Sequence, residues 1–170
     1  MALEIERKYL LKRIPNISWT RMIEIKQYYL QDGTRIRSSF LKEVGSGDFE
    51  YVKCKKTLLS KNPKVYDEQE NIISKEEFDK LLGKAKTGLM KTRLIKKVSG
   101  GLKWEVDVYE DFDLIVAEIE IPSKKYIVSV PKFIKDVLVM EVTEFSQFSN
   151  RNLSDKIINK KNTKTKKNAK

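Results

Sequence analysis

The sequence predicts a mainly β fold (α+β), a closed eight-stranded antiparallel β-barrel that forms a tunnel with flanking helices. Three observations support this prediction. Eight segments show the residue patterns of strands, turn signals separate several of them, and one segment has a clear helix start signal. Eight strands that mostly follow one another as hairpins favour an antiparallel barrel over an α/β fold.

The predicted strands are Leu3–Leu11, Glu24–Leu30, Thr34–Leu41, Phe49–Leu58, Val65–Ile73, Met90–Val98, Leu102–Tyr109 and Leu114–Ile121. Two tight turns are expected between neighbouring strands, at Asp32-Gly33 and at Ser99-Gly100-Gly101. Gly45-Ser46-Gly47 predicts a looser loop.

Two helical segments are expected beside these strands. Ser74 followed by Glu77 resembles a capping box, which opens a predicted helix over Lys75–Lys84. A second helical segment is expected within Pro131–Val137.

Composition is typical of one globular domain with many charges. Of the 170 residues, 40% are hydrophobic and 35% are charged, and no linker divides residues 1–155. Residues 156–170 are expected to form a lysine-rich disordered tail, because Asn159–Lys167 has no apolar residue to bury. The net charge of +11 suggests an anionic partner, although nucleic acid is the less favoured one.

Several protein classes are excluded by what the sequence lacks. No apolar run approaches the ~20 residues of a membrane span, and Met1–Glu4 lacks the layout of a signal peptide. The single cysteine, Cys54, excludes an internal disulfide framework. These features favour a cytoplasmic protein with no membrane partner. Because there is no histidine, any metal must be bound by oxygen ligands, which suits Mg²⁺ or Mn²⁺.

Charged residues alternate with apolar residues on seven of the predicted strands. Side chains at i and i+2 of a strand point to the same face. The charged positions are Glu4, Glu6 and Lys8; Arg35 and Arg37; Lys53 and Lys55; Glu68 and Glu70; Lys91 and Arg93; Glu105 and Asp107; and Glu118 and Glu120. The opposite faces carry apolar residues such as Ile36, Val106 and Ile119.

Most of these strands carry pairs of one sign, and like charges repel by up to ~1 kcal/mol when directly opposed. A solvated face explains one such strand, but seven favour charged faces that line a lumen. The apolar exterior would then be covered by helices or by a second subunit, as in a homodimer. A metal would compensate the carboxylates and a polyphosphate the basic residues. Cys54, between two lumen lysines, is expected to point outwards into packing.

The same residues resemble the signature of a known family. Glu4-Ile5-Glu6-Arg7-Lys8 is similar to the ExExK signature of the CYTH superfamily, also called triphosphate tunnel metalloenzymes. Further matches follow in family order within residues 1–155, at Gln27–Leu30, Arg35–Arg37, Lys53–Lys55, Glu68–Glu70, Lys91–Arg93, Trp104–Tyr109 and Ala117–Glu120. Glu141–Thr143 and Ser149–Leu153 resemble the family's closing segment. The chain is most similar to the bacterial inorganic tripolyphosphatases.

The resemblance implies a tunnel that binds a triphosphate with Mg²⁺ or Mn²⁺ and hydrolyses it. The implied metal ligands are Glu4, Glu6, Glu118 and Glu120. Glu68, Glu70, Glu105 and Asp107 are candidates for binding a second metal or for positioning water, or else they are ion-pair partners of the lumen lysines and arginines. The implied triphosphate-binding residues are Lys8, Arg35, Arg37, Lys53, Lys55, Lys91 and Arg93. The expected catalytic residues are Glu4, Glu6, Lys8 and Arg93.

Two alternatives stay open at the level of sequence. Class IV adenylate cyclases and thiamine or nucleoside triphosphatases share the tunnel, but no motif identifies a pocket for a base or a thiazolium. A polyphosphate- or RNA-binding module without turnover would account for the basic tail. The carboxylate pairs argue against that module, because a pure anion binder has no use for them.

Overall fold

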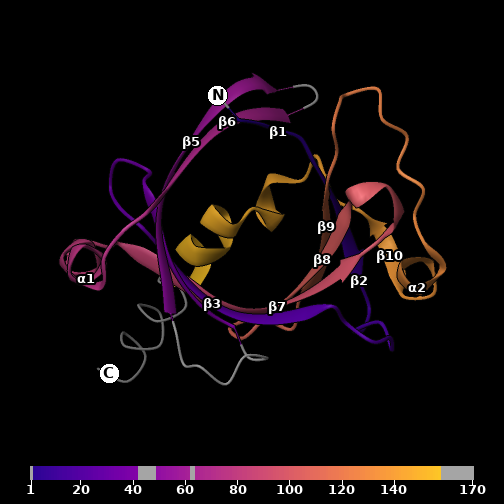
Figure 1. The fold of residues 1–170 in the computed structure, drawn as a ribbon, viewed down its shortest axis with the longest axis horizontal. Helices are drawn as coiled ribbons and strands as arrows, with labels where there is room; N and C mark the ends of the chain where they lie inside the picture. The colour runs from indigo at the N-terminus through magenta and orange to yellow at the C-terminus, as the bar shows by residue number, and fades with distance from the viewer. Residues whose placement is uncertain (1, 42–48, 62–63, 158–170) are drawn as a thin grey trace, which may run out of the picture.

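A computed structural model describes residues 2–41, 49–61 and 64–157 and shows one antiparallel sheet curled around a central space (Figure 1). Within these residues the strands are β1 (Ala2–Glu4), β2 (Glu6–Leu11), β3 (Arg21–Tyr29), β4 (Arg35–Leu41), β5 (Phe49–Lys61), β6 (Lys64–Ile72), β7 (Thr87–Lys97), β8 (Lys103–Tyr109), β9 (Ile115–Glu120) and β10 (Leu138–Glu141). Their order in the sheet is β1-β6-β5-β4-β3-β7-β8-β9-β2-β10. The mainly β prediction is confirmed.

The prediction of a closed eight-stranded barrel is wrong in the number of strands and in the closure of the sheet. The described residues form ten strands, and the hydrogen-bonded order ends at β1 on one side and β10 on the other. The predicted first strand breaks at Ile5, so that β1 pairs with β6 while β2 pairs with β9 and β10. Since one residue separates β1 from β2, the chain itself bridges the two sides of the curled sheet.

The outer face of β2, β8 and β9 carries the largest apolar core. Its buried members are Ile5, Tyr9, Leu11, Val65, Leu94, Trp104, Val106, Ala117, Ile119, Ile121, Ile134 and Val137. Helix α2 (Lys132–Lys135) contributes Ile134 and covers this face from outside (Figure 1). The expectation that helices cover an apolar exterior is therefore confirmed here.

Helix α1 (Lys75–Leu82) covers the opposite side of the sheet, over β4 and β5. The Ser74 side chain accepts a hydrogen bond from the Glu77 backbone N–H, as the capping box predicts. The buried Phe78 ring packs against the rings of Tyr28 and Tyr51, with centroids 6.4 and 4.9 Å away. The aromatic contacts attach α1 to the sheet.

A helix over residues 150–157 lies within the curl of the sheet, where Figure 1 shows it in yellow. Its Leu153 and Ile157 are buried against Leu89, Tyr109 and Val116. Short 3₁₀ turns occupy Ser99–Gly101 and Ser146–Phe148. Gly100 and Gly101 have φ values of +78° and +76°, which glycine tolerates, so the predicted turn is confirmed.

Two predicted segments lie outside the described residues. They are the loop at Gly45-Ser46-Gly47 and the tail from residue 158 onwards. Residues 156 and 157, assigned to the tail from sequence, are instead helical. None of the described helices has the length and apolar character required to cross a membrane.

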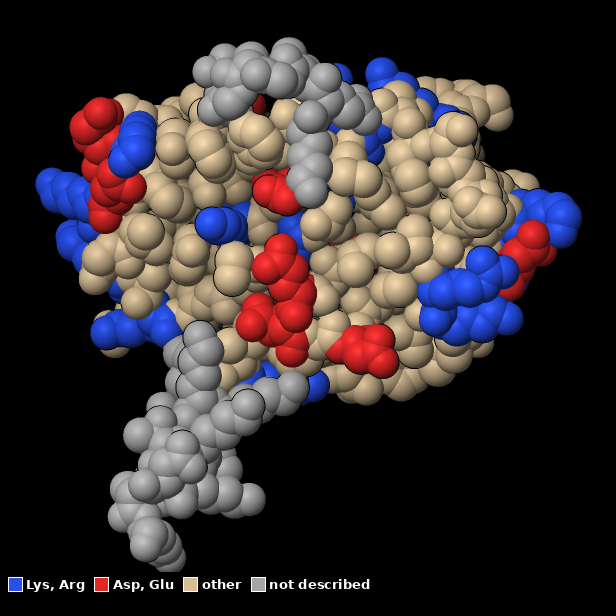
Figure 2. Space-filling view, turned by 90° about the horizontal axis from the view of Figure 1, so that it is seen from below, with Lys and Arg blue, Asp and Glu red and all other residues tan. Residues whose placement is uncertain are grey.

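The exterior beneath β3 and β7 is largely neutral in Figure 2, although 35% of the residues of this chain are charged. Acidic side chains gather near the middle of this face and basic ones towards its ends. Many charged side chains of the strands lie instead on the inner face of the sheet.

We predict that Gly88→Ala destabilises the fold. Gly88 pairs with Tyr28 across β3 and β7, and a Cβ atom added there would lie 2.4 Å from Tyr28 Cδ1. The displaced ring would cost about 1–3 kcal/mol and lower the melting temperature measured by calorimetry. In a Tyr28→Ala background the same substitution should cost much less, and an equal cost in both backgrounds would contradict this explanation.

Candidate active site

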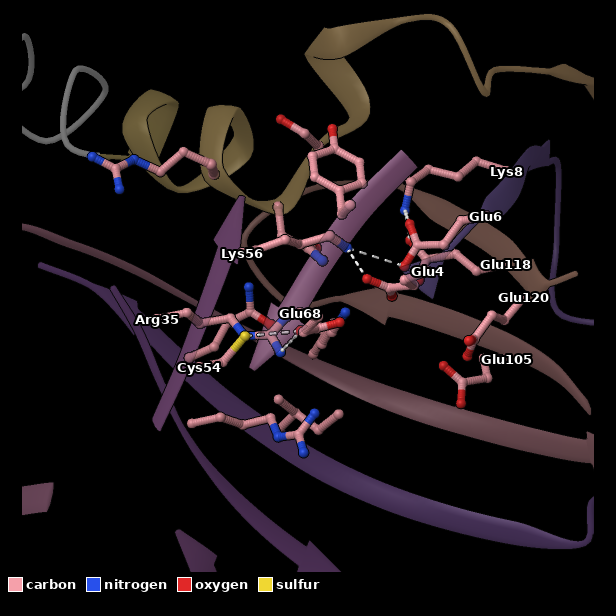
Figure 3. Close-up of a pocket in the computed structure, with 18 of the residues that line it drawn as sticks. Glu4, Glu6, Lys8, Arg35, Cys54, Lys56, Glu68, Glu105, Glu118 and Glu120 are labelled. Carbon is pink, nitrogen blue, oxygen red and sulfur yellow. Dashed lines mark hydrogen bonds and ion pairs between the residues drawn. The ribbon is translucent and has the colours of Figure 1, made fainter. Parts of the chain in front are cut away.

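The concave face of the sheet encloses a cavity of about 530 Å³ with a charged wall (Figure 3). Of the fifteen charged residues predicted to share a lumen, twelve line it: Glu4, Glu6, Lys8, Arg35, Arg37, Glu68, Glu70, Lys91, Arg93, Glu105, Glu118 and Glu120. Asp107 is fully buried in the wall behind them, against Lys91 and Arg93. The alternation of charge thus placed most of these residues on the correct face.

Strand β5 turns the opposite face to the cavity from the one predicted. Lys53 and Lys55 do not line the cavity; Lys53 Nζ lies 2.6 Å from Glu77 Oε1 of α1, and Lys55 is exposed. Cys54 and Lys56 line the cavity in their place. The prediction that Lys53 and Lys55 face the lumen, and the predicted outward direction of Cys54, are therefore wrong.

The pairing of β5 with its neighbours explains this difference. Cys54 pairs with Arg35 on β4 and with Glu70 on β6, while Lys56 pairs with Glu68. Paired residues share a face, and a shift of one residue exchanges the two faces of a strand. Burial raises the pKa of the Cys54 thiol to about 12, so this side chain is a neutral thiol at physiological pH.

Carboxylates from β1, β2 and β9 gather on one side of the cavity around two lysines. Lys8 Nζ lies 2.8 Å from Glu6 Oε2 and also contacts Glu118 Oε1. Lys56 Nζ lies 2.5 Å from Glu4 Oε2 and 3.5 Å from Glu6 Oε1. All four residues predicted as metal ligands thus share this wall, because Glu120 also lines it and pairs with Glu6 in the sheet.

The crowded carboxylates share protons. Burial, followed by hydrogen bonds to Glu6 and Glu68, raises the pKa of Glu4 to about 10. The pKa of Glu6 lies well below its usual value, despite burial, because Lys8 is adjacent and Glu4 donates a hydrogen bond. Burial, with the nearby carboxylates of Glu6 and Glu105, raises the pKa of Glu120. Glu4 therefore holds a proton that a bound cation could replace.

The chemistry of this wall suits a hard divalent cation, because its donors are carboxylate oxygens. Glu4, Glu6, Glu118 and Glu120 are the residues that would hold such an ion, after displacing the proton and the lysine contacts. In the described part of the chain, only Cys54, Glu68 and Glu70 bring three candidate ligand atoms within 4.8 Å of one another. That group is already engaged, since Arg35 Nη2 lies 2.8 and 2.7 Å from the two carboxylates.

Buried ion pairs form the wall contributed by β7, β8 and β9. Asp107 accepts hydrogen bonds from Lys91 Nζ at 2.5 Å and from Arg93 Nε and Nη2, both at 2.7 Å. These two cations lower the pKa of Asp107 despite its complete burial. Arg93 also contacts Glu105 and lies 3.2 Å from Glu118. A network of this kind fixes side chains that solvent would otherwise leave free.

Each of the four second-metal candidates is part of an ion pair. Glu68 and Glu70 pair with Arg35, Glu70 also lies 3.9 Å from Arg37, and Glu105 and Asp107 pair with Arg93. The ion-pair alternative stated for these residues thus describes their arrangement in this structure. Their part in binding a second metal stays a prediction.

Three basic residues that line the cavity, Lys56, Lys103 and Arg151, were not predicted from the sequence. Lys56 lies one position beyond the chosen lysine pair, and the register with Glu68 is the signal that would have identified it. Arg151 reaches the cavity from helix 150–157, with its guanidinium carbon 5.1 Å from the centroid of the Tyr29 ring. No alternation rule for strands could have found a residue on that helix.

Comparison with known proteins supports this architecture through structure. The sequence matches no family model and no curated protein. The inorganic triphosphatase NE1496 has a similar structure, with a TM-score of 0.56 and 26% identity over 91% of this chain and 95% of that one. PH1819 from Pyrococcus horikoshii OT3 has a TM-score of 0.54 and 19% identity over 72% and 80% of the two chains.

These neighbours confirm the resemblance to the triphosphate tunnel metalloenzymes. PH1819 supports the fold alone. The chain therefore has a CYTH-type fold, with a triphosphatase among its structural neighbours.

We predict that, without metal, Glu4→Gln is more stable than the wild type at alkaline pH. A pKa of about 10 in the folded state, against 4.5 normally, means that folding takes up a proton, so stability is lost as pH rises from about 5 to 10. This loss amounts to about 1.4 kcal/mol for each pH unit between the two pKa values, so the glutamine variant, which lacks it, should be several kcal/mol more stable than the wild type at pH 8. Thermal unfolding in a chelator measures the effect, and parallel pH profiles for both proteins would contradict it.

Proposed function

We propose that this protein hydrolyses a triphosphate, most suitably inorganic tripolyphosphate, with the help of Mg²⁺ or Mn²⁺ inside the charged cavity. The observation that carries the proposal is the pairing of basic and acidic side chains around one enclosed space. Basic side chains from β2, β4, β5, β7, β8 and helix 150–157 line this space together with carboxylates from β1, β2, β6, β8 and β9. The neighbour named as an inorganic triphosphatase supports the same activity.

The basic residues would bind and orient the phosphate chain. Lys8, Arg35, Arg37, Lys56, Lys91, Arg93 and Arg151 all line the cavity. Arginine offers two parallel donors to phosphate oxygens, whereas lysine offers a compact charge. Lys91 is 2% exposed and bound to Asp107, so its role is to hold the wall rather than to contact substrate directly.

The carboxylates would hold the metal and position the attacking water. When bound, Mg²⁺ or Mn²⁺ supplies charge neutralisation at phosphate oxygens. Glu6 is ionised and lies between Lys8 and Lys56, so it is the carboxylate most ready to accept a cation. Without histidine in the chain, a carboxylate is the base available to the attacking water.

We predict that Lys56→Met lowers kcat/KM for tripolyphosphate about 10- to 100-fold, the loss expected for one charge-assisted contact. Lys55→Met is the matched control, because it removes a neighbouring lysine that is exposed and does not line the cavity. The control should stay within about twofold of wild type. Equal losses in both variants would show that general charge, rather than position in the cavity, determines activity.

A substrate panel tests the proposed reaction. Phosphate release from tripolyphosphate, ATP and thiamine triphosphate is measured with and without Mg²⁺ or Mn²⁺, together with formation of cyclic AMP. We expect metal-dependent release, fastest from tripolyphosphate, and a loss of at least 100-fold in Glu6→Gln. Cyclic AMP formation without tripolyphosphate hydrolysis would instead identify a cyclase, and equal negligible release by both proteins would identify a binding module.

A further inference from the structure

Lys56 occupies the space between two of the predicted metal ligands. Its amine lies 2.5 Å from Glu4 Oε2 and 3.5 Å from Glu6 Oε1. Figure 3 shows the side chain reaching towards these carboxylates, and the three side chains are 27%, 15% and 20% exposed. An ammonium group is charged at neutral pH, so Lys56 compensates this partly buried pair as a bound metal ion would.

The lysine reaches this place from a strand that does not pair with β1. Strand β6 separates β5 from β1 in the sheet, and the residue opposite Lys56 on β6 is Glu68, whereas Glu4 pairs with Tyr66. Since neighbouring strands are about 4.8 Å apart, the side chain crosses the inner face of β6 to contact Glu4. Its amine lies 4.6 Å from the centroid of the Tyr66 ring. The pairing of strands does not hold the amine at Glu4, and the flexible four-carbon stem allows it to move.

Lys8, the other lysine of this wall, has its partners close to its own backbone. It contacts Glu6, two residues away on β2, and Glu118, which lies directly opposite on β9. These two carboxylates remain next to Lys8 whatever the cavity binds. Lys56 is therefore the lysine of this wall that can leave its carboxylates.

A group expected to bind phosphate lies beside the backbone position of Lys56. Arg35 Nη2 is 2.8 Å from Glu68 Oε1, and Glu68 is the residue opposite Lys56 in the sheet. A phosphate bound by Arg35 would therefore lie within reach of the Lys56 amine once the amine leaves Glu4. Lys56 thus stands between predicted metal ligands on one side and a predicted phosphate ligand on the other.

We propose that the Lys56 amine exchanges between these two sides, and that this exchange couples metal binding to triphosphate binding. The inference rests on the proposed function for the identity of the two ligands. The amine must leave Glu4 and Glu6 before a divalent cation can bind there, because like charges at this distance repel. A triphosphate gives the displaced amine new anionic partners. Each ligand therefore favours binding of the other, as reciprocal coupling requires.

The test measures two separate affinities of Lys56→Met by calorimetry, under conditions without turnover. One is the affinity for Mn²⁺ without triphosphate, and the other is the affinity for tripolyphosphate in a chelator. Loss of the amine should tighten Mn²⁺ binding about tenfold and weaken metal-free tripolyphosphate binding by a similar factor, within the usual range of coupling between sites. Shifts of opposite sign are the signature of one charge that serves both ligands.

Lys55→Met is the matched control, because it removes an exposed lysine that does not line the cavity. Both of its affinities should stay within about twofold of wild type, as expected for an exposed charge. Weaker or unchanged Mn²⁺ binding in Lys56→Met, or unchanged tripolyphosphate binding, would overturn the proposal. Shifts of the same size in Lys55→Met would overturn it as well.

Two further variants separate the charge of Lys56 from its part in the stability of the wall. Lys56→Gln keeps a polar side chain without charge and should show the same opposite shifts as Lys56→Met. Lys56→Arg keeps the charge and should retain the weaker Mn²⁺ binding of the wild type. Tight Mn²⁺ binding by Lys56→Arg would contradict competition between the side-chain charge and the metal.

These binding measurements separate the inference from the proposed function. Opposite shifts in a protein that releases no phosphate from tripolyphosphate would support the exchange and contradict the hydrolase. Metal-dependent hydrolysis, with the Mn²⁺ affinity of Lys56→Met unchanged, would support the hydrolase and overturn the exchange. Absence of binding of both ligands to the wild type would overturn both.

Discussion

The enclosure of charge within a curled sheet is the constraint on which the rest of this structure depends. Removing an ion from water costs several kcal/mol unless a partner compensates it. The inner wall meets this requirement by placing opposite charges on neighbouring strands, as Asp107 does between Lys91 and Arg93. Most of the inner pairs join neighbouring strands, which explains why most single strands carry charges of one sign, although Lys8 and Glu6 form a pair along β2.

The same constraint determines the exterior. Where the charged side of a strand faces inwards, its apolar side faces outwards and must be covered. Helix α2 and the residues next to it cover β2, β8 and β9, while α1 covers β4 and β5 through Phe78. The larger cluster of buried apolar side chains therefore lies on the outside of the sheet, and a smaller one packs helix 150–157 within its curl.

Ligand binding to such a cavity is an exchange of partners. Arg35 and Arg93 bind carboxylates in this structure, and Glu4 holds a proton between Glu6 and Glu68. A phosphate chain alone would leave these carboxylates without cations, and a metal alone would leave the arginines without anions. Both ligands together compensate both sets, which links the affinity for triphosphate to the affinity for the metal.

The sequence by itself determined the β-rich architecture, the charged inner face and most of the residues that line it. The alternation of charge over seven strands is a local property, and side-chain direction along a regular strand follows directly from it. Only the tertiary structure decided which face of β5 turns inwards, because its run of lysines at positions 53, 55 and 56 fits either face. The register with β4 and β6 placed Cys54 and Lys56 inside. Tertiary packing also decided that helix 150–157 lies within the curl of the sheet (Figure 1), since its burial depends on Leu89, Tyr109 and Val116, which lie far away in sequence.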